Sequence, residues 1–151
     1  MIEIEPGTAA QAADIESIRS AEDEIGFRLP ESYVEFILST NGGIPKRRYF
    51  NSERGPQVVE RFLSFVPDYK VNELGDYDVE VVWTQIWDRL ESGLCPFAAL
   101  FAGDFLCFTL DDPGNGRVVL WDHELSDYRS PALTPIAENF EALVEMLSEE
   151  Y

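Results

Sequence analysis

The hydrophobic pattern near the N-terminus predicts two helices. From Ala12 to Ile25 the apolar side chains are three or four residues apart, which places them on one face of a helix. Gly26 follows, and glycine is common where a helix ends in the left-handed conformation. A second helix is expected from Pro30, because a first-turn proline lacks only an N–H that would be unpaired there. It should end at Asn41-Gly42-Gly43, three residues that tolerate a positive φ.

Two further helices are predicted in the middle and near the C-terminus. From Val79 to Leu90 the apolar residues recur at helical spacing, the most regular pattern in the chain. Trp83 and Trp87 belong to this apolar stripe, so we expect both indoles in the core. The last helix is expected to begin at Thr134-Pro135, a capping residue followed by a first-turn proline, and to carry its apolar residues inward.

Five strands are predicted between these helices. Turn residues at 102–104 and at 111–116 join the last three strands as consecutive antiparallel hairpins. Helices at both ends of a run of hairpins indicate an α+β fold. We therefore expect a single domain, residues 1–151, with a mainly antiparallel sheet of about five to six strands packed by N-terminal, middle and C-terminal helices. The predicted strands are Arg48–Phe50, Phe62–Val66, Phe97–Phe101, Phe105–Leu110 and Arg117–Trp121.

The net charge excludes several classes of partner. Eleven Lys and Arg residues against 29 Asp and Glu residues give −18, which argues against direct binding to nucleic acid or to an anionic membrane. The longest apolar run, Phe97 to Ala102, is too short to cross a bilayer, and the first residues lack the pattern of a secretory signal. Two cysteines make no disulfide framework. We expect a soluble, cytoplasmic protein.

The charge is unevenly distributed. Between Lys46 and Lys70 the chain carries six of its eleven basic residues and a net charge of +3, so the remainder carries −21. An acidic body with one basic loop is compatible with the electrostatic half of a protein interface, but solubility alone is the favoured explanation of the acidic excess by itself. If an interface exists, the acidic body and the basic loop around Arg47 and Arg48 are the two candidates.

Cys107 and His123 suggest a nucleophile and its base, since they lie on or near adjacent predicted strands. Cys107, however, sits in the apolar run Phe105-Leu106-Cys107-Phe108, where a buried thiol behaves as a small hydrophobic side chain. Cys95, at the entry to a strand, is interpreted in the same way. A structural role is therefore favoured for both cysteines, and a small Cys/His hydrolase is the least favoured hypothesis.

A calcium loop is the other chemistry that the sequence suggests. Counting from Asp111, acidic or amide residues occupy some of the positions of a calcium-binding loop as far as Asp122. Pro113 stands at the third position and offers no side-chain oxygen, and the twelfth is Asp rather than a bidentate Glu. A hairpin turn explains the same residues, so no metal and no cofactor are predicted.

Short motifs recur in a fixed order along the chain. A Gly-x-x-Leu-Pro joint at 26–30 precedes Tyr33 and Phe36, and Asn41-Gly42-Gly43 follows. Gly103-Asp104 lies between two predicted strands, and Trp121-Asp122-His123-Glu124 ends the next one. In this order, and together with the closing segment 136–143, the motifs resemble those of the SMI1/KNR4 family, the founding branch of the SUKH superfamily. The resemblance extends from about residue 12 to residue 147 and is weakest over 46–91.

The resemblance implies an α+β domain with a mainly antiparallel sheet. Bacterial members of this family resemble immunity proteins that bind and neutralise toxins delivered between cells, many of them nucleases. Fungal relatives regulate cell-wall synthesis through a domain flanked by disordered tails, and the lack of such tails here favours the bacterial type. The family's motifs carry no catalytic role to transfer, so no enzyme activity is expected.

The leading hypothesis is therefore a protein-binding immunity protein that occludes a basic toxin domain. The alternative is a regulatory or scaffolding module without a toxin partner, and no oligomeric state follows from the pattern. Acidic residues beside a half-buried aromatic side chain suit the rim of a protein interface. The predicted partner-binding residues are Asp111, Asp112, Trp121, Asp122 and Glu124.

Overall fold

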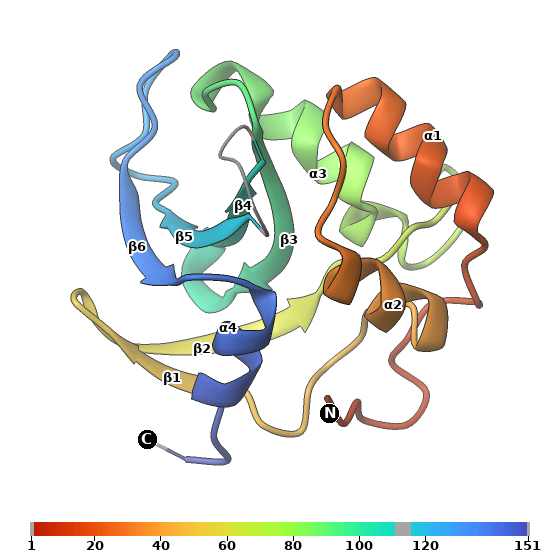
Figure 1. The fold of residues 1–151 in the computed structure, drawn as a ribbon, viewed down its shortest axis with the longest axis horizontal. Coiled ribbons are helices and arrows are strands. Elements are labelled where there is room, and N and C mark those ends of the chain that lie inside the picture. The colour runs from red at the N-terminus through yellow and green to blue at the C-terminus, as the bar shows by residue number, and fades with distance from the viewer. Residues whose placement is uncertain (1, 111–115, 151) are drawn as a thin grey trace.

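A computed structural model describes residues 2–110 and 116–150 of the chain (Figure 1). Within these residues, six strands lie in the sheet in the order of the sequence, each antiparallel to its neighbours. The expected α+β fold with an antiparallel sheet is thus confirmed. The elements are α1 (Ile15–Ile25), α2 (Glu31–Ser39), β1 (Tyr49–Ser52), β2 (Gly55–Phe62), η1 (Gly75–Tyr77), α3 (Val79–Ile86), η2 (Trp87–Arg89), β3 (Leu94–Leu100), η3 (Phe101–Gly103), β4 (Phe105–Thr109), β5 (Arg117–Trp121), β6 (Leu133–Ala137) and α4 (Phe140–Met146).

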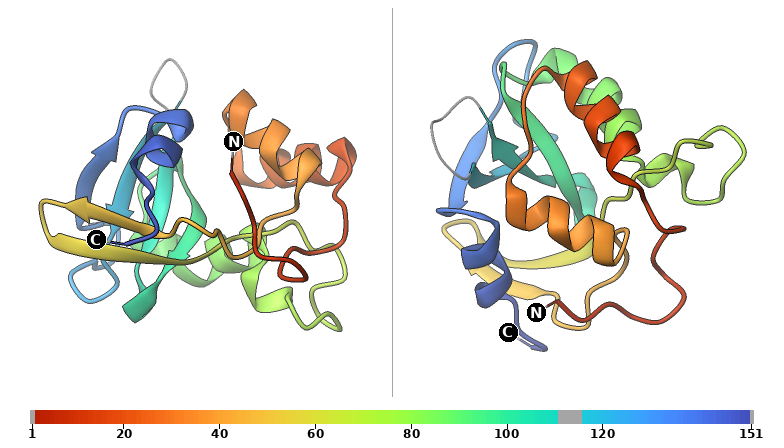
Figure 2. Two further views of the ribbon diagram at one scale, coloured as in Figure 1. Left: turned by 90° about the horizontal axis from the view of Figure 1, so that it is seen from below. Right: turned by 45° about the vertical axis from the view of Figure 1, so that its right-hand side comes forward.

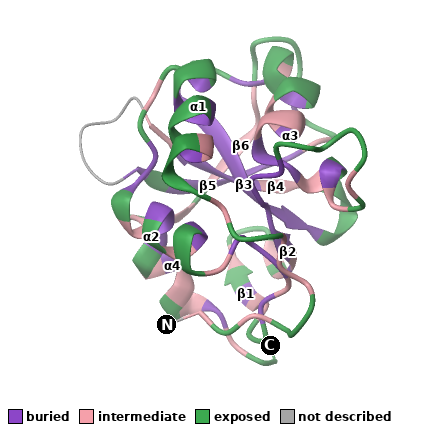
Figure 3. Cartoon of the chain, turned by 90° about the vertical axis from the view of Figure 1, so that its right-hand side faces the viewer, coloured by how far each residue is buried: buried purple, intermediate pink, exposed green. Residues whose placement is uncertain are grey.

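The helices α1, α2 and α3 gather on one side of the molecule and α4 lies beside the β1–β2 hairpin (Figures 1 and 2). The chain after α4 returns to the edge of the sheet, where Ser148 exchanges backbone hydrogen bonds with Tyr49 of β1. Buried residues follow the strands and the inner faces of the helices (Figure 3). No helix within the described residues is long and apolar enough to cross a membrane.

The main core is built around the ring of Tyr33 on α2. The rings of Phe97, Phe108 and Phe140 lie 5.8, 5.1 and 5.4 Å from it, all at edge-to-face angles, which is a favourable aromatic geometry. A second, smaller cluster lies on the opposite face of the central strands, because alternate residues of a strand point to opposite faces. Its buried members are Ile86, Leu90, Leu94, Cys107, Val119 and Trp121.

The first two helices form as the sequence predicts. Asp14 precedes α1 and accepts a hydrogen bond from the Ser17 amide, and Gly26 ends the helix at φ 91°. The second helix follows Pro30 and ends at Ser39, two residues before Asn41-Gly42-Gly43.

Asn41 anchors the segment after α2 to the interior. Its side chain donates to the carbonyl oxygens of Gln11 and Phe65 and accepts from the Phe65 amide. Gly42 and Gly43 both have positive φ, and a Cβ on Gly42 would lie 2.5 Å from the Leu63 carbonyl oxygen. The motif is thus required by close packing as well as by helix termination.

The middle helix is shorter than predicted. It ends at Ile86, and the chain tightens into the 3-10 helix η2, which rotates the next side chain away from the apolar stripe. Trp83 packs partly buried against both cores, but Trp87 is 57% exposed. The expectation that Trp87 belongs to the core is therefore wrong.

The C-terminal helix starts later than predicted. Thr134 and Pro135 lie in β6 rather than in a first turn. Proline is tolerated there because β6 is an edge strand, where a missing N–H removes no ladder bond from a further neighbour. The helix begins after Asn139, whose side chain accepts from the Ala142 amide, and it buries Phe140 and Leu143.

The second strand was predicted out of place. It runs from Gly55 to Phe62, whereas the apolar run 63–66 is a buried connection beyond its end. Backbone groups pair its first two amides, Leu63 with the Phe97 carbonyl oxygen of β3 and Ser64 with that of Tyr77. Side chains pair the next two: Asn41 accepts from the Phe65 amide, and Asp78 accepts from the Val66 amide at 2.6 Å.

Candidate functional site

Three of the five predicted partner-binding residues fall within the described part of the chain: Trp121 is buried, Asp122 is buried and Glu124 is exposed. Asp111 and Asp112 lie outside the described residues, as do the first five positions of the loop that was compared with a calcium site. The hairpin that this loop joins does form, because β4 pairs with β5 over its whole length.

Trp121 is not the half-buried aromatic residue that was expected. It is 0% exposed, because η2 covers the end of β5. Its indole Nε1 donates to the Arg89 carbonyl oxygen at 3.1 Å, and the Arg89 guanidinium lies 4.8 Å from the ring centre. The Phe105 ring lies on the neighbouring strand, 6.0 Å away. Trp121 therefore packs beneath η2 as a buried core residue and is not exposed for contact with a partner protein.

Asp122 fixes the turn that leaves β5. Its Oδ1 accepts from the amides of Glu124 and Leu125 at 2.8 and 2.9 Å, and its Oδ2 pairs with the Arg54 guanidinium. Burial alone would raise the pKa of this carboxyl, but the two amides and Arg54 outweigh burial and lower it. Asp122 is thus a negatively charged structural residue, and Glu124, beside it, projects into solvent.

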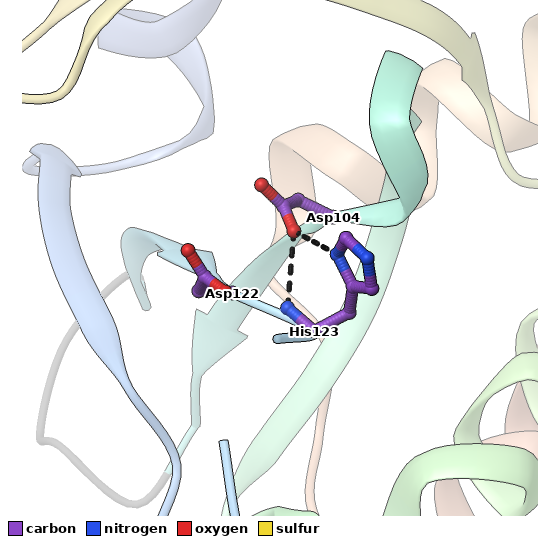
Figure 4. Close-up of side chains that lie close together, drawn as sticks. All are labelled: Asp104, Asp122 and His123. Atoms are coloured by element: carbon purple, nitrogen blue, oxygen red, sulfur yellow. Dashed lines mark hydrogen bonds and ion pairs between the residues drawn. The ribbon is translucent and has the colours of Figure 1, made fainter. Parts of the chain in front are cut away.

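A second acidic residue, Asp104, meets this turn from the start of β4 (Figure 4). Its Oδ1 accepts from the His123 amide at 3.0 Å and lies 2.6 Å from His123 Nδ1. Sequence reasoning did not pair these two residues, although both lie in the short motifs that were singled out. Gly103, which precedes Asp104, has φ 92°, a left-handed conformation that favours glycine.

Asp104, Asp122 and His123 offer ligand atoms within 4.8 Å of one another, a spacing compatible with a metal ion. Contacts within the chain already use these atoms. The Asp122 carboxylate holds Arg54 and two amides, and Asp104 holds the His123 backbone and ring. A positively charged guanidinium on one of the three groups also disfavours a cation beside it. The arrangement is explained as a structural network that joins three connections of the sheet.

The β3–β4 connection carries backbone strain at the same end of the sheet. Ala102 has φ 77°, a left-handed conformation that costs a residue with a Cβ about 1 kcal/mol or more. The turn holds Phe101 outward at 53% exposure, with the Arg48 guanidinium 5.2 Å from its ring.

The basic segment 46–70 does not form a cationic loop. Most of it folds as the β1–β2 hairpin and the buried chain after it, and three of its four arginines contact the protein itself. Arg48 donates to the carbonyl oxygens of Val59 and Glu60, and Arg54 pairs with Asp122. Arg61 is the most enclosed of them.

Arg61 is 5% exposed and lies with its guanidinium 4.8 Å from the Tyr77 ring. It donates to the carbonyl oxygens of Thr8 and Phe62 and to the Ser64 hydroxyl. Burial lowers its pKa, while Tyr77 and Glu60 oppose that change. Of the arginines in this segment, only Arg47 combines exposure with no hydrogen bond or ion pair recorded among the described residues.

The cysteines have the environment that was predicted for them. Cys107 is 0% exposed in the smaller core and lies opposite Val119, and burial raises the pKa of its thiol. Cys95 is equally buried, with its pKa raised for the same reason. The His123 ring is hydrogen-bonded to Asp104 instead of to a thiol. A buried, protonated thiol without a base is a poor nucleophile.

Comparison with known proteins agrees with the motifs and with the fold. The family model described as SMI1-KNR4 cell-wall (SUKH_6) matches residues 15–144. The chain is also similar to the SPbeta prophage-derived uncharacterized protein YokK of Bacillus subtilis (strain 168), at 26% identity over 152 residues that cover 89% of this chain and 74% of that protein. No solved structure matches the chain. The chain belongs to the SMI1-KNR4 family of the SUKH superfamily.

Proposed function

We propose that this protein is an immunity protein of the cytoplasm that neutralises a polymorphic or contact-dependent toxin by binding over it. Membership of the SMI1-KNR4 family supports a protein-binding role, and the similarity to a protein of Bacillus subtilis agrees with the bacterial type. The proposed partner is a basic toxin domain, with a nuclease as the natural case, since an enzyme that holds nucleic acid must present a positive surface.

The observation that carries this proposal is the charge of the surface. The net charge is −18, and several of the few cations are engaged inside the fold. The basic interface considered from the sequence lay around Arg47 and Arg48. Arg48 is engaged within the fold, as are Arg54 and Arg61, which weakens that alternative, whereas Arg47 is exposed. The exposed surface is therefore acidic, which favours rapid association with a basic protein at low salt.

The predicted partner-binding residues divide into two groups under this proposal. Glu124, with a side chain 80% exposed, is suited to contact the partner, and Asp111 and Asp112 remain proposed contacts. Trp121 and Asp122 are positioning residues, because they hold the chain around Glu124 through Arg89, Arg54 and two backbone amides.

The test is capture followed by a toxicity assay. The tagged protein is purified from its native host, and co-purifying proteins are identified by mass spectrometry. Each candidate is then expressed alone and together with this protein in a heterologous bacterium. The proposal predicts that one captured partner arrests growth alone and that co-expression restores growth. A captured partner that is harmless in the heterologous cell would favour the regulatory or scaffolding alternative.

A further inference from the structure

Three large, exposed apolar side chains lie in two segments that are hydrogen-bonded to each other, η2 and the connection between β5 and β6. Trp87 in η2 is 57% exposed, and Leu125 and Tyr128 in the connection are 63% and 66% exposed. Burying such side chains is favourable, and Trp, Tyr and Arg are the residues that contribute most at protein interfaces. We name this area the Trp87 surface; it comprises Trp87, Asp88, Glu91, Leu125, Tyr128 and Arg129.

The two segments of the Trp87 surface are fixed to each other. The Arg129 amide donates to the Asp88 carbonyl oxygen at 2.8 Å, and Arg89 donates from its guanidinium to the His123 carbonyl oxygen at 2.9 Å. The Trp121 indole donates to the Arg89 carbonyl oxygen from below. The loop is therefore held in one conformation before any partner arrives, which reduces the entropy lost on binding.

Arg129 adds backbone strain to this junction. Its φ is 53°, in the left-handed region that a residue with a Cβ rarely adopts. The conformation turns the Arg129 amide onto Asp88 and leaves the guanidinium 5.3 Å from the Tyr128 ring. Strain of this kind is concentrated at binding sites, where the surrounding structure holds it.

A groove of about 440 Å³ lies at this surface. Leu90 and Leu94 are buried apolar residues of its lining, Trp83 and Trp87 also line it, and Asp88, Glu91 and Arg129 bring charged groups. An apolar lining with a few charged groups is the usual composition of a site that receives one large side chain of a partner.

The charges of the two segments indicate which partner fits. Over residues 87–93 and 122–131, the exposed side chains with full charges comprise four carboxylates and one guanidinium. The structure records no ion pair for Asp88 or Glu91 within residues 2–110 and 116–150. The four carboxylates are Asp88, Glu91, Glu124 and Asp127, and the guanidinium is Arg129.

We propose that the Trp87 surface is the docking site for a basic protein segment, which inserts an apolar side chain into the groove beside Trp87 and pairs an adjacent Lys or Arg with Asp88 and Glu91. The proposal rests on the proposed function in one respect, that the partner is a protein of opposite charge. It adds the location of the interface and the chemistry of the segment that enters it.

The test uses a phage library of random 16-residue peptides as the probe, selected on the wild-type protein. Selected clones are then measured on Trp87→Ser, on Asp88→Asn/Glu91→Gln and on the control Tyr69→Ser, which alters an exposed aromatic residue of another segment. We expect the selected peptides to carry a large apolar residue next to Lys or Arg. Their affinity should fall about tenfold or more on both variants of the Trp87 surface and should not change on the control. The proposal would be overturned if the selected peptides bound Trp87→Ser as tightly as the wild-type protein, or if their consensus sequence were acidic. It would also be overturned if the wild-type protein enriched no peptides beyond those that Trp87→Ser enriches.

A second measurement locates the contact and monitors the fold. The chain has three tryptophans, so its indole N–H groups give three assignable NMR signals. Titration with a selected peptide should shift the Trp87 signal and leave that of Trp121, which is buried and hydrogen-bonded to Arg89. A shift confined to the other tryptophans would contradict the proposal. Because no toxin is used, failure here is separate from failure of the growth-rescue assay.

Discussion

Replacing Asp122 by Asn tests whether this carboxylate is a structural group. The side chain is 5% exposed, and its oxygens accept from two backbone amides and from Arg54. An Asn side chain keeps one acceptor oxygen but loses the negative charge and presents an amino group to Arg54. Hydrogen bonds to a charged group contribute about 1.5–3 kcal/mol, and a half-exposed ion pair adds little. We therefore expect a loss of about 2 kcal/mol in the free energy of unfolding.

Urea unfolding followed by tryptophan fluorescence measures this loss, with Glu124→Gln as the matched control. The Glu124 side chain is 80% exposed, so its substitution should change stability by less than about 0.5 kcal/mol.

The effect should also depend on pH. Because the folded protein lowers the pKa of Asp122, its stabilisation is fully present above the unfolded pKa of about 3.9 and is lost as the pH falls through the folded value. The difference between wild type and Asp122→Asn should thus shrink below about pH 4. Equal stability of the two proteins at pH 7, or a difference that grows in acid, would refute the structural role.

Three further predictions concern the interior. Gly42→Ala should lower the free energy of unfolding by about 3 kcal/mol or more, because a Cβ there would meet the Leu63 carbonyl oxygen at 2.5 Å. Gly26→Ala is the control: Gly26 has φ 91° but open space around it, so the loss should be about 1 kcal/mol. Equal losses for the two variants in thermal unfolding would argue against the close packing at Gly42. Tyr33→Phe should leave the free energy of unfolding unchanged or raise it by about 1 kcal/mol, because the Tyr33 hydroxyl is buried without a hydrogen-bond partner among the described residues. In urea unfolding, a loss above about 2 kcal/mol would show that the hydroxyl does have a hydrogen-bond partner. Cys107 should resist a thiol reagent in the native protein and react on unfolding, and rapid native labelling would contradict its burial.

The fold was predictable where local patterns and tertiary packing agree. The apolar spacing before Gly26 and the turns between β3, β4 and β5 describe elements that form much as local propensity favours. Prediction failed at Thr134-Pro135, where a helix-start signature lies in an edge strand. It also failed for the run 63–66, where the distant side chains of Asn41 and Asp78 pair the amides of Phe65 and Val66. Hydrogen bonds of that kind leave no periodic signal in a sequence.

The surface was less predictable than the core. Trp121 was expected to be half-buried and is fully buried, whereas Trp87 was expected in the core and is exposed. Both differences arise because η2 departs from α-helical geometry and covers the end of β5. A change from an α-helix to a 3-10 helix moves every following side chain to another face, and helical periodicity does not report it. Asp122 was interpreted as a surface carboxylate because its partner, Arg54, lies far away in the sequence.

Neutralisation of a toxin is tested most directly by titrating the purified, captured partner with this protein and measuring the partner's toxic activity. For a nuclease, that activity is the rate of nucleic-acid cleavage. Occlusion predicts that the rate falls in proportion to the protein added and vanishes in excess, and that added salt weakens the effect because acidic and basic surfaces associate. A complex that forms and retains the full cleavage rate would contradict the account.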